Sequence, residues 1–396
     1  MAVLSREVWN WAAPVTAMAV MSITLSLSLP LFALLMERLG ASGTVIGLNH
    51  SVGALAMVVT APLLPLILKR VGLIPLMLGS VLLLAFCTIT IPLFQSVWWW
   101  ALLRIGWGFA ATAMFFGSEF WVVTRAPDHM RGRIVGGYVV VLSASYMLGP
   151  LLLRAVGIDT MLIYIIPTAI ILLSAVPLIL GRHAAPEPEH DAPAGIVRTL
   201  RFFVTDPLVL WGVVLFGVIE FGAMGLITVW GLRSGLDQDT AVGLAFFLAA
   251  GSLLFQFPIG WAADRFDRRR LLAMGAVIAL IAPIVMMNFV GTIWALNLII
   301  MIWGGTAVGF YSVALTELGA RYRGNVMAQA NAAVMLAYGL GALLTPGSFG
   351  LAMDLIPPDG LLWLAAVAAA AYLSLALVRL RAPARVPLDS ETESGT

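Results

Sequence analysis

Two charged residues, Glu220 and Arg104, stand inside long apolar stretches and are the first candidates for chemistry. A charge at the centre of a bilayer costs about 2.5 to 3.5 kcal/mol on insertion scales, so each of them needs a compensating role. A buried carboxylate such as Glu220, set between Gly217 and Gly222, can bind a proton near neutral pH or hold a cationic group. A hydrogen-bonded role in helix packing is the alternative.

Arg104 keeps its charge at physiological pH, so it must face a cavity, a carboxylate or a substrate anion, or else play a structural hydrogen-bonding role. Other polar side chains also interrupt apolar segments. A histidine can titrate, and amide or phenol groups can bind substrate or join two helices by hydrogen bonds. The expected substrate or proton path consists of Glu220, Arg104, His50, Gln256, Asn331 and Tyr338.

The segments around these residues have the composition of a membrane protein. Hydrophobic residues make up 61% of the 396 residues and charged residues 11%, against roughly 45–50% and about 25% in soluble domains. This composition excludes a soluble enzyme, a disordered chain and a nucleic-acid-binding domain. The formal net charge of +2 is too small to suggest a polyanionic partner.

The sequence offers no site for a cofactor or a metal. Cys87 is the only cysteine and lies in an apolar run, and the four histidines do not cluster. A glycine-rich phosphate-binding loop is absent, which argues against ATP-driven pumping by this chain. We therefore expect no cofactor, no metal and no enzymatic activity.

Stretches of roughly 20 apolar residues, the length that spans a bilayer, recur along the chain. The first is too long for a signal peptide and is interpreted as a membrane span. The fold class expected is an all-α polytopic membrane protein with twelve transmembrane helices. Six spans lie at 10–36, 44–68, 73–95, 98–122, 133–155 and 159–181, and six more at 206–230, 239–262, 271–291, 293–316, 325–352 and 360–380.

A polar stretch divides the twelve spans into two sixes. It contains three prolines and three acidic residues between Pro186 and Pro193, a composition that is typical of a flexible linker. The expected organisation is a six-helix half at 1–181, a linker at 182–205, a second six-helix half at 206–380 and a tail at 381–396.

The placement of basic residues predicts the orientation in the membrane. If both termini are cytoplasmic, only Arg38, Arg154 and Arg233 of the 22 Lys and Arg residues face outward, and Arg104 lies within a span, which leaves 18 on the cytoplasmic side. This bias follows the positive-inside rule. We expect a multi-pass protein of the bacterial cytoplasmic (inner) membrane, surrounded by lipid and monomeric.

The two halves repeat one another. The fourth and tenth spans each end with a glutamate followed by arginines, and the fifth and eleventh spans each contain a Gly/Pro pair. Two six-span halves are the architecture of a transporter that rocks around a site between them. Proline bends helices, so the expected helix kinks are Gly149, Pro150 and Pro346.

Charged residues at the cytoplasmic ends of these spans could form ion-pair latches that hold one conformation. Asp264 could cap the N-terminus of a neighbouring helix, and Arg268 could reach Glu317. For Glu119 and Glu317, proton binding and plain interface anchoring are the alternatives. The expected cytoplasmic gate is Arg70, Glu119, Arg131, Arg133, Asp264, Arg265, Arg268, Glu317 and Arg321.

Several motifs resemble those of the major facilitator superfamily. The stretch Gly260–Arg270 resembles its loop motif, Arg104 with Gly108 resembles its fourth-span Arg-x-x-x-Gly, and Gly149-Pro150 is similar to its antiporter-associated motif. The first-half loop departs from the pattern, because Lys69 stands where the second half has Asp264. Glu119 with the following Arg-Gly-Arg, Gly217–Glu220 and Gln256–Trp261 resemble the bacterial YcaD-like transporters.

The resemblance implies a secondary transporter that moves a small molecule by alternating access. One hypothesis is a proton-coupled antiporter that exports amphipathic drugs or metabolites, favoured by Glu220 and the apolar walls. The other is uptake of a small polar or anionic solute, favoured by Arg104 and His50. A lipid flippase and a non-transporting sensor are more distant alternatives. Substrate, direction and coupling are left open by the sequence.

Overall fold

The computed structural model describes residues 6–125, 131–186, 196–322 and 324–381. Within these ranges, the side chains of residues 6–10, 65, 131–133, 135–136, 196–199, 264, 324–325 and 327–329 are not described. The described chain is helical throughout, apart from short turns and connections.

The first half of the chain forms eight α-helices, because two of its six apolar stretches are divided into shorter pieces. Short 3₁₀ segments, η1, η2 and η3, extend or connect them. The bounds are α1 Arg6–Arg38, α2 Gly43–Thr60, η1 Ala61–Leu63, α3 Leu64–Val71, α4 Leu73–Ile89, η2 Ile91–Leu93, α5 Val97–Arg125, α6 Arg131–Val156, α7 Leu162–Leu173, α8 Ala175–Leu180 and η3 Arg182–Ala184.

The second half begins with a short helix and continues with six long helical stretches. The first of these stretches contains a π-helical segment, η4. The bounds are α9 Ile196–Thr205, α10 Pro207–Gly217, η4 Val218–Ala223, α11 Met224–Arg233, α12 Gln238–Arg265, α13 Arg268–Met286, α14 Ile293–Arg321, α15 Gly324–Leu355 and α16 Gly360–Arg381.

Eleven helical stretches among the described residues are long and apolar enough to cross a membrane. The remaining predicted span, 98–122, is α5, which is 29 residues long. Its length suffices, but a run of tryptophans together with Arg104 and Glu119 makes it less apolar than the others. Helix α5 nevertheless packs within the bundle against α1, α2 and α4, where the sequence predicted a span.

The second part of the predicted linker forms a helix. Residues 196–205 form helix α9. Its Phe202 is buried and packs edge-to-face on Tyr322, in the connection between α14 and α15, with the two ring centroids 5.4 Å apart. The neighbouring Phe203 contacts Trp211 of α10 in the same geometry. Apolar residues recur at helical spacing in this segment. The prolines and charges that precede it dominate the composition of the whole stretch, so the sequence analysis did not predict this helix. Residues 187–195 lie outside the described part.

Helix boundaries follow local capping chemistry. The Ser42 side chain accepts a hydrogen bond from the Val45 amide at the start of α2, and Asp237 does the same for Thr240 in α12. Such side chains satisfy amides that have no partner within the helix. Gly72 separates α3 from α4 with a φ of 83°, a conformation that favours glycine.

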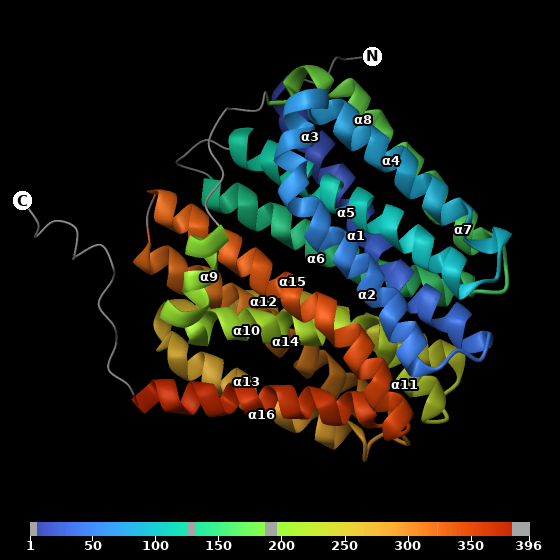
Figure 1. The fold of residues 1–396 in the computed structure, drawn as a ribbon, viewed down its shortest axis with the longest axis vertical. Helices are drawn as coiled ribbons and strands as arrows, with labels where there is room; N and C mark the ends of the chain where they lie inside the picture. The colour runs from blue at the N-terminus through green and yellow to red at the C-terminus, as the bar shows by residue number, and fades with distance from the viewer. Residues whose placement is uncertain (1–5, 126–130, 187–195, 323, 382–396) are drawn as a thin grey trace, which may run out of the picture.

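The two halves form two helical bundles that lie side by side (Figure 1). We call the end where α1 begins and α16 ends the linker end, because the chain also passes there from α8 to α9; the opposite end is the far end. Across the halves, α2 packs on α15, α6 on α12 and α1 on α11. Figure 1 shows the bundles converging near α2 and α11 and diverging toward α3, α8 and α9.

Close backbone contact is what brings α2 and α15 together. A side chain at Gly47 would collide with the backbone of Pro346, and one at Gly350 would collide with that of Gly43. Glycine is therefore required at these crossings, as is common between membrane helices. Helices α6 and α15 run without interruption through Pro150 and Pro346, and Gly149 packs tightly on α1. Bending of these helices during transport stays a prediction.

Candidate functional site

A charged network joins the two halves at the far end, and Arg233 is its centre. Its guanidinium donates to both carboxylate oxygens of Glu37, at 3.0 and 2.9 Å, and to Asp354 at 3.2 Å. Glu37 belongs to α1 in the first half, whereas Arg233 and Asp354 belong to the second. All three side chains are at most one quarter exposed, so water screens their attraction only partly.

Asp354 also caps a helix of the opposite half. Its carboxylate accepts hydrogen bonds from the backbone amides of Gly43 and Thr44 and from the Thr44 hydroxyl, each at 2.7 Å. These amides are the first of α2, where a helix attracts negative charge. We call Glu37, Arg233 and Asp354, together with the start of α2, the far-end latch.

Two more exposed pairs surround the latch. Arg154 of α6 binds Asp239 of α12 with two bonds of 2.8 and 2.6 Å. Arg38 bonds Asp159 at 2.5 Å and Gln238 at 2.9 Å. The Arg38 guanidinium holds the pKa of Asp159 below its ordinary value. Surface pairs of this kind contribute little to stability, because water screens them.

Sequence reasoning missed the far-end latch as a site. It identified Arg38, Arg154 and Arg233 only as exceptions to the positive-inside bias. The sequence did contain a signal for this network. The span ends that carry these arginines, or that lie on the same side of the membrane, also carry the acidic residues Glu37, Asp239 and Asp354. Acidic residues paired with the few outward arginines would have indicated this network.

At the linker end, the ion pairs among the described side chains join helices of the second half only. Arg268 of α13 bonds Glu317 of α14 at 3.1 Å, which is the contact that the sequence predicted. Arg321 binds the same Glu317 and also donates to Asp206 at 2.9 Å. Asp206, 1% exposed, further accepts a bond of 2.7 Å from the Tyr322 hydroxyl. This network holds α9, α10, α13 and α14 together.

Replacing Asp206 by alanine is expected to destabilise the second half by about 3 kcal/mol, because the acceptor of three buried or half-buried bonds is lost and Arg321 is partly desolvated. The loss of stability is measured as a decrease in the melting temperature of the purified protein in detergent. Asp239→Ala, at an exposed pair, is the control. A decrease no larger than that of the control would contradict the structural role.

The other gate residues do not form a latch between the halves among the described side chains. Arg70 is exposed on α3, and the Arg265 guanidinium lies over the Trp261 ring, 4.2 Å from its centroid. The side chains of Arg131, Arg133 and Asp264 lie outside the described residues. Contacts in a conformation closed at the linker end therefore stay a prediction.

Glu119 lies in the interior rather than beside an arginine that the structure describes. It is half-buried near the end of α5, and the hydroxyls of Tyr138 and Tyr311 lie within electrostatic range of its carboxylate. Tyr138 belongs to α6 of the same half, and Tyr311 to α14 of the other half. Ser118, which precedes Glu119 in the chain, is hydrogen-bonded to the Tyr138 hydroxyl at 2.9 Å.

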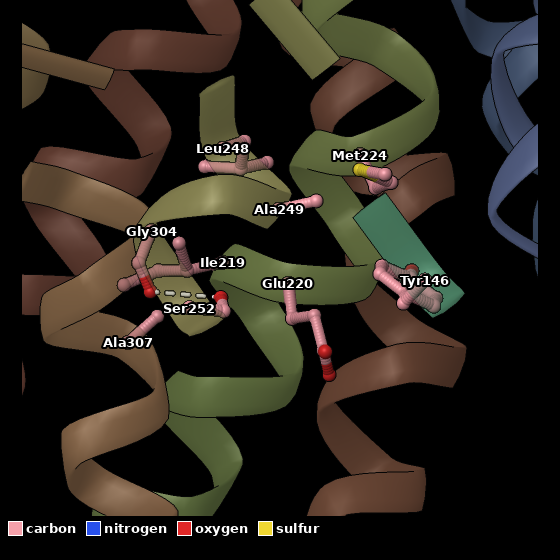
Figure 2. A pocket seen from close by; sticks show the side chains of 9 residues that line it. All are labelled: Tyr146, Ile219, Glu220, Met224, Leu248, Ala249, Ser252, Gly304 and Ala307. Atoms are coloured by element: carbon pink, nitrogen blue, oxygen red, sulfur yellow. Dashed lines mark hydrogen bonds between the residues drawn. The ribbon is translucent and has the colours of Figure 1, made fainter. Parts of the chain in front are cut away.

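Glu220 occupies the middle of the π-helical segment η4, between α10 and α11. A π-helical turn often marks a functional site, because it departs from the regular hydrogen-bond pattern. Figure 2 shows the Glu220 carboxylate directed away from Ser252 and Gly304, with Tyr146 of α6 beside the same segment. A cavity of about 10 Å³ touches Glu220, Tyr146 and Ser252, enough for about one water molecule.

Aromatic side chains surround the Glu220 carboxylate. The phenols of Tyr338 of α15, Tyr146 and Tyr311 lie within electrostatic range of the carboxylate. Phe216, one turn earlier on α10, places its ring centroid 5.4 Å from those of both Tyr311 and Tyr338. We call Phe216, Tyr146, Tyr311 and Tyr338 the aromatic box. Among the described residues, no Lys or Arg forms an ion pair with Glu220.

Gln256 extends this region along the seam between the halves. Its amide oxygen accepts a 3.2 Å bond from Ser143 of α6, one turn from Tyr146, while Gln256 itself lies one turn from Ser252 on α12. Asn331 is exposed on α15, away from these contacts. The structure thus brings Glu220, Tyr338 and Gln256 to one inter-half region.

Arg104 and His50 form a separate cluster closer to the far end. The Arg104 guanidinium donates weakly to Ser28, at 3.3 and 3.4 Å, and lies 4.4 Å from the Phe32 ring centroid. Its Nε and both His50 ring nitrogens are buried without a partner of good geometry. His50 packs on Gly225 of the opposite half, where a larger residue would not fit. A buried cation without an anion is costly, which makes this cluster a second candidate site.

The sequence of the chain matches one known family along most of its length. The sequence model described as Major Facilitator Superfamily matches residues 15–254 and 238–395. Both matches together cover the two halves and the connection between them.

Curated relatives are similar at low identity. An uncharacterized MFS-type transporter, YfkF of Bacillus subtilis, is 27% identical over 252 residues, which cover 62% of this chain and 63% of that protein, just under two thirds of its length. A second, YcaD of Escherichia fergusonii, is 23% identical over 277 residues, covering 70% of this chain and 71% of the relative.

Solved structures share the fold. A bacterial homologue of the human lysosomal transporter Spinster, inward-facing and unoccupied, aligns with a TM-score of 0.71 at 16% identity and covers 94% of both chains. A D-xylose–proton symporter aligns with a TM-score of 0.73 at 13% identity, covering 95% of this chain and 98% of the other. At these identities the likeness concerns the fold alone.

Proposed function

Because the chain belongs to the major facilitator superfamily and is a membrane transporter of that family, we propose that it exports amphipathic cations in exchange for protons. The observation that carries this proposal is the Glu220 carboxylate inside the aromatic box, without a described cationic partner. Aromatic faces attract cations, and a carboxylate supplies the counter-charge. The site combines the two groups that recognise an apolar cation.

In this proposal the Glu220 carboxylate also couples export of the substrate to uptake of protons. An ionised carboxylate in an apolar interior is costly unless a positive charge neutralises it. A proton and a cationic substrate both satisfy Glu220, and the binding of one excludes the other. Release of the substrate therefore requires uptake of a proton, which is the logic of an antiporter.

The orientation supports export when combined with the far-end latch. The positive-inside bias of the sequence, 18 of the 22 Lys and Arg residues on one side, favours a cytoplasmic linker end in a bacterial inner membrane. In this proposal the far-end latch joins the two halves on the outer side of the membrane and blocks access from there. In this state the site takes its substrate from the cytoplasmic side.

A second candidate function, uptake of a small anion, rests on Arg104. Its guanidinium is buried and, among the described residues, has no carboxylate partner. A substrate carboxylate or phosphate would supply the missing charge. His50, beside it, would then supply a further donor or accept a proton.

A thermal-shift screen in detergent separates the two functions. Under the proposed function, a two-ring monocation such as methylphenylpyridinium raises the melting temperature of the wild type and not that of Glu220→Gln. Ligand at a hundred times its Kd stabilises by about 2.7 kcal/mol, which is readily measured. Stabilisation by a small anion instead, lost in Arg104→Ala, would contradict cation export and support uptake.

A further inference from the structure

A larger cavity, which we call the far-end cavity, lies at the far end and is lined by residues of the first half only. Its volume is about 260 Å³, and it is enclosed by the end of α1, by η2, by the start of α5 and by the connection from α6 into α7. Every connection at this end belongs to the described residues. A cavity of roughly 150 Å³ holds a benzene molecule, so this one admits an aromatic ring with a charged head group.

The walls of the far-end cavity combine apolar surface with one pair of opposite charges. Ile91, Trp100 and Ile158 are buried apolar side chains of the wall. The Trp100 indole N–H already donates to the Ile91 carbonyl oxygen at 3.1 Å, so its ring offers apolar contact. Arg38 and Asp159, joined at 2.5 Å, supply the charges. Such walls suit a ligand with an apolar body and a charged head.

The charged pair can form further hydrogen bonds. A guanidinium has five N–H donors, and Arg38 uses three of them, two toward Asp159 and one toward Gln238 of the second half. These two partners hold the Arg38 side chain beside the cavity, which lowers the cost of ordering it around a ligand. An ionised carboxylate offers about four acceptor sites, and Arg38 occupies two of those on Asp159. A ligand can therefore bind both groups without breaking the pair.

The Tyr164 hydroxyl is a second sign of a missing ligand. Tyr164 is only 6% exposed and lines the far-end cavity, yet its hydroxyl has no hydrogen-bond partner among the described residues. A buried phenol normally finds such a partner. A polar group of a molecule in the cavity would provide it.

We propose that the far-end cavity binds a small zwitterion whose ammonium and acid groups lie close together, as in an amino acid with an apolar side chain. The acid group binds Arg38 and the Tyr164 hydroxyl, and the ammonium binds Asp159. The apolar side chain packs against Trp100. Neighbouring opposite charges in the protein thus match neighbouring opposite charges in the ligand. This site is separate from the proposed exchange at Glu220, because no residue of the aromatic box lines the cavity.

Three molecules with one phenyl body and different charges test the site. Phenylalanine is the zwitterion, phenethylamine carries only the ammonium and phenylpropionate only the acid group. Isothermal titration calorimetry of the protein in detergent measures each affinity, in a Glu220→Gln background so that binding of the amine to the aromatic box does not enter. We expect Arg38→Gln to weaken phenylalanine and phenylpropionate on the order of tenfold, and Asp159→Asn to weaken phenylalanine and phenethylamine equally.

Two further variants locate the ligand. Arg154→Gln is the matched control, because Arg154 also forms an ion pair at the far end and is as exposed as Arg38, 44% against 45%, but does not line the cavity. It should leave all three affinities within about twofold. Tyr164→Phe keeps the ring and should weaken phenylalanine a few-fold. A folding defect would weaken all three molecules together, whereas each charge variant is expected to spare one of them.

Several results would overturn the zwitterion site. Phenylalanine could fail to bind the Glu220→Gln protein, or its affinity could be unchanged in Arg38→Gln or in Asp159→Asn. Binding of a short-chain phosphatidylethanolamine without binding of phenylalanine would assign the cavity to a lipid head group instead. If phenylalanine behaves as expected while cation binding at Glu220 fails, only the proposed function is wrong.

Discussion

Glu220→Gln is expected to lower proton-driven transport by roughly a hundredfold while leaving the protein folded. Loss of one charge from a buried, hydrogen-bonded pair costs about 2–5 kcal/mol, and glutamine can hold neither a proton nor a cation by charge. The amide has the same shape and can keep the packing of the carboxylate. Reconstituted vesicles with an imposed pH gradient and a fluorescent amphipathic cation measure the rate.

Two controls make this result specific. The melting temperature of Glu220→Gln without ligand should stay within a few degrees of the wild type, because the π-helical segment keeps its packing. Tyr338→Phe, which removes the hydroxyl partner and keeps the ring, should reduce the rate less than Glu220→Gln does. Transport by Glu220→Gln at the wild-type rate would refute the assignment of this residue.

Asp354→Asn is expected to shift the protein toward a conformation open at the far end. The substitution removes the charge that caps α2 and pairs with Arg233, across the two halves. Loss of a charged cap and of a half-buried pair amounts to about 2 kcal/mol, or roughly a thirtyfold change in the equilibrium between conformations. Arg233 would still hold Glu37, so the far-end latch is weakened rather than abolished.

A cysteine at position 51 reports this opening. The Ser51 hydroxyl donates to the Leu343 carbonyl oxygen at 2.8 Å across the α2–α15 crossing, so Ser51→Cys is shielded while the far end is closed. In a Cys87→Ala background, since Cys87 is the native cysteine, the labelling rate with a membrane-impermeant maleimide should rise at least about tenfold in Asp354→Asn.

Asp239→Asn is the matched control for that shift. It breaks an exposed pair between the same two halves, which is worth about 0–1 kcal/mol, and should change the labelling rate by only a few-fold. Equal labelling in the two variants, or no change in Asp354→Asn, would show that the latch does not set the resting conformation.

Local chemistry explains what was predictable. A membrane-spanning helix must satisfy its own backbone groups and present apolar side chains to lipid, so eleven of the twelve predicted spans could be located from composition alone, and the twelfth is the 29-residue helix α5. Glu220 stood out for the same reason, because a charge in an apolar stretch is rare. The contact between Arg268 and Glu317 was also predictable, since the repeat placed both at neighbouring span ends.

Other features depended on positions far apart in the chain. The residues of the far-end latch come from the ends of α1, α11 and α15, where a charged side chain is ordinary in any membrane helix. Helix α9 was hidden because its flanking prolines and charges dominate the composition of the stretch. For Glu119, the sequence indicated a position at the end of a span but not the neighbouring Tyr138 of α6, which Ser118 contacts.

By itself, the sequence determined the position and polarity of the apolar spans, since hydropathy is a property of each segment. Only the tertiary structure decided which charges meet. The rotation of each helix about its axis and the contact between the halves brought Tyr146 and Tyr311 to Glu220, and Asp354 to the start of α2. Such contacts arise from packing between distant segments, which a local pattern of residues does not encode.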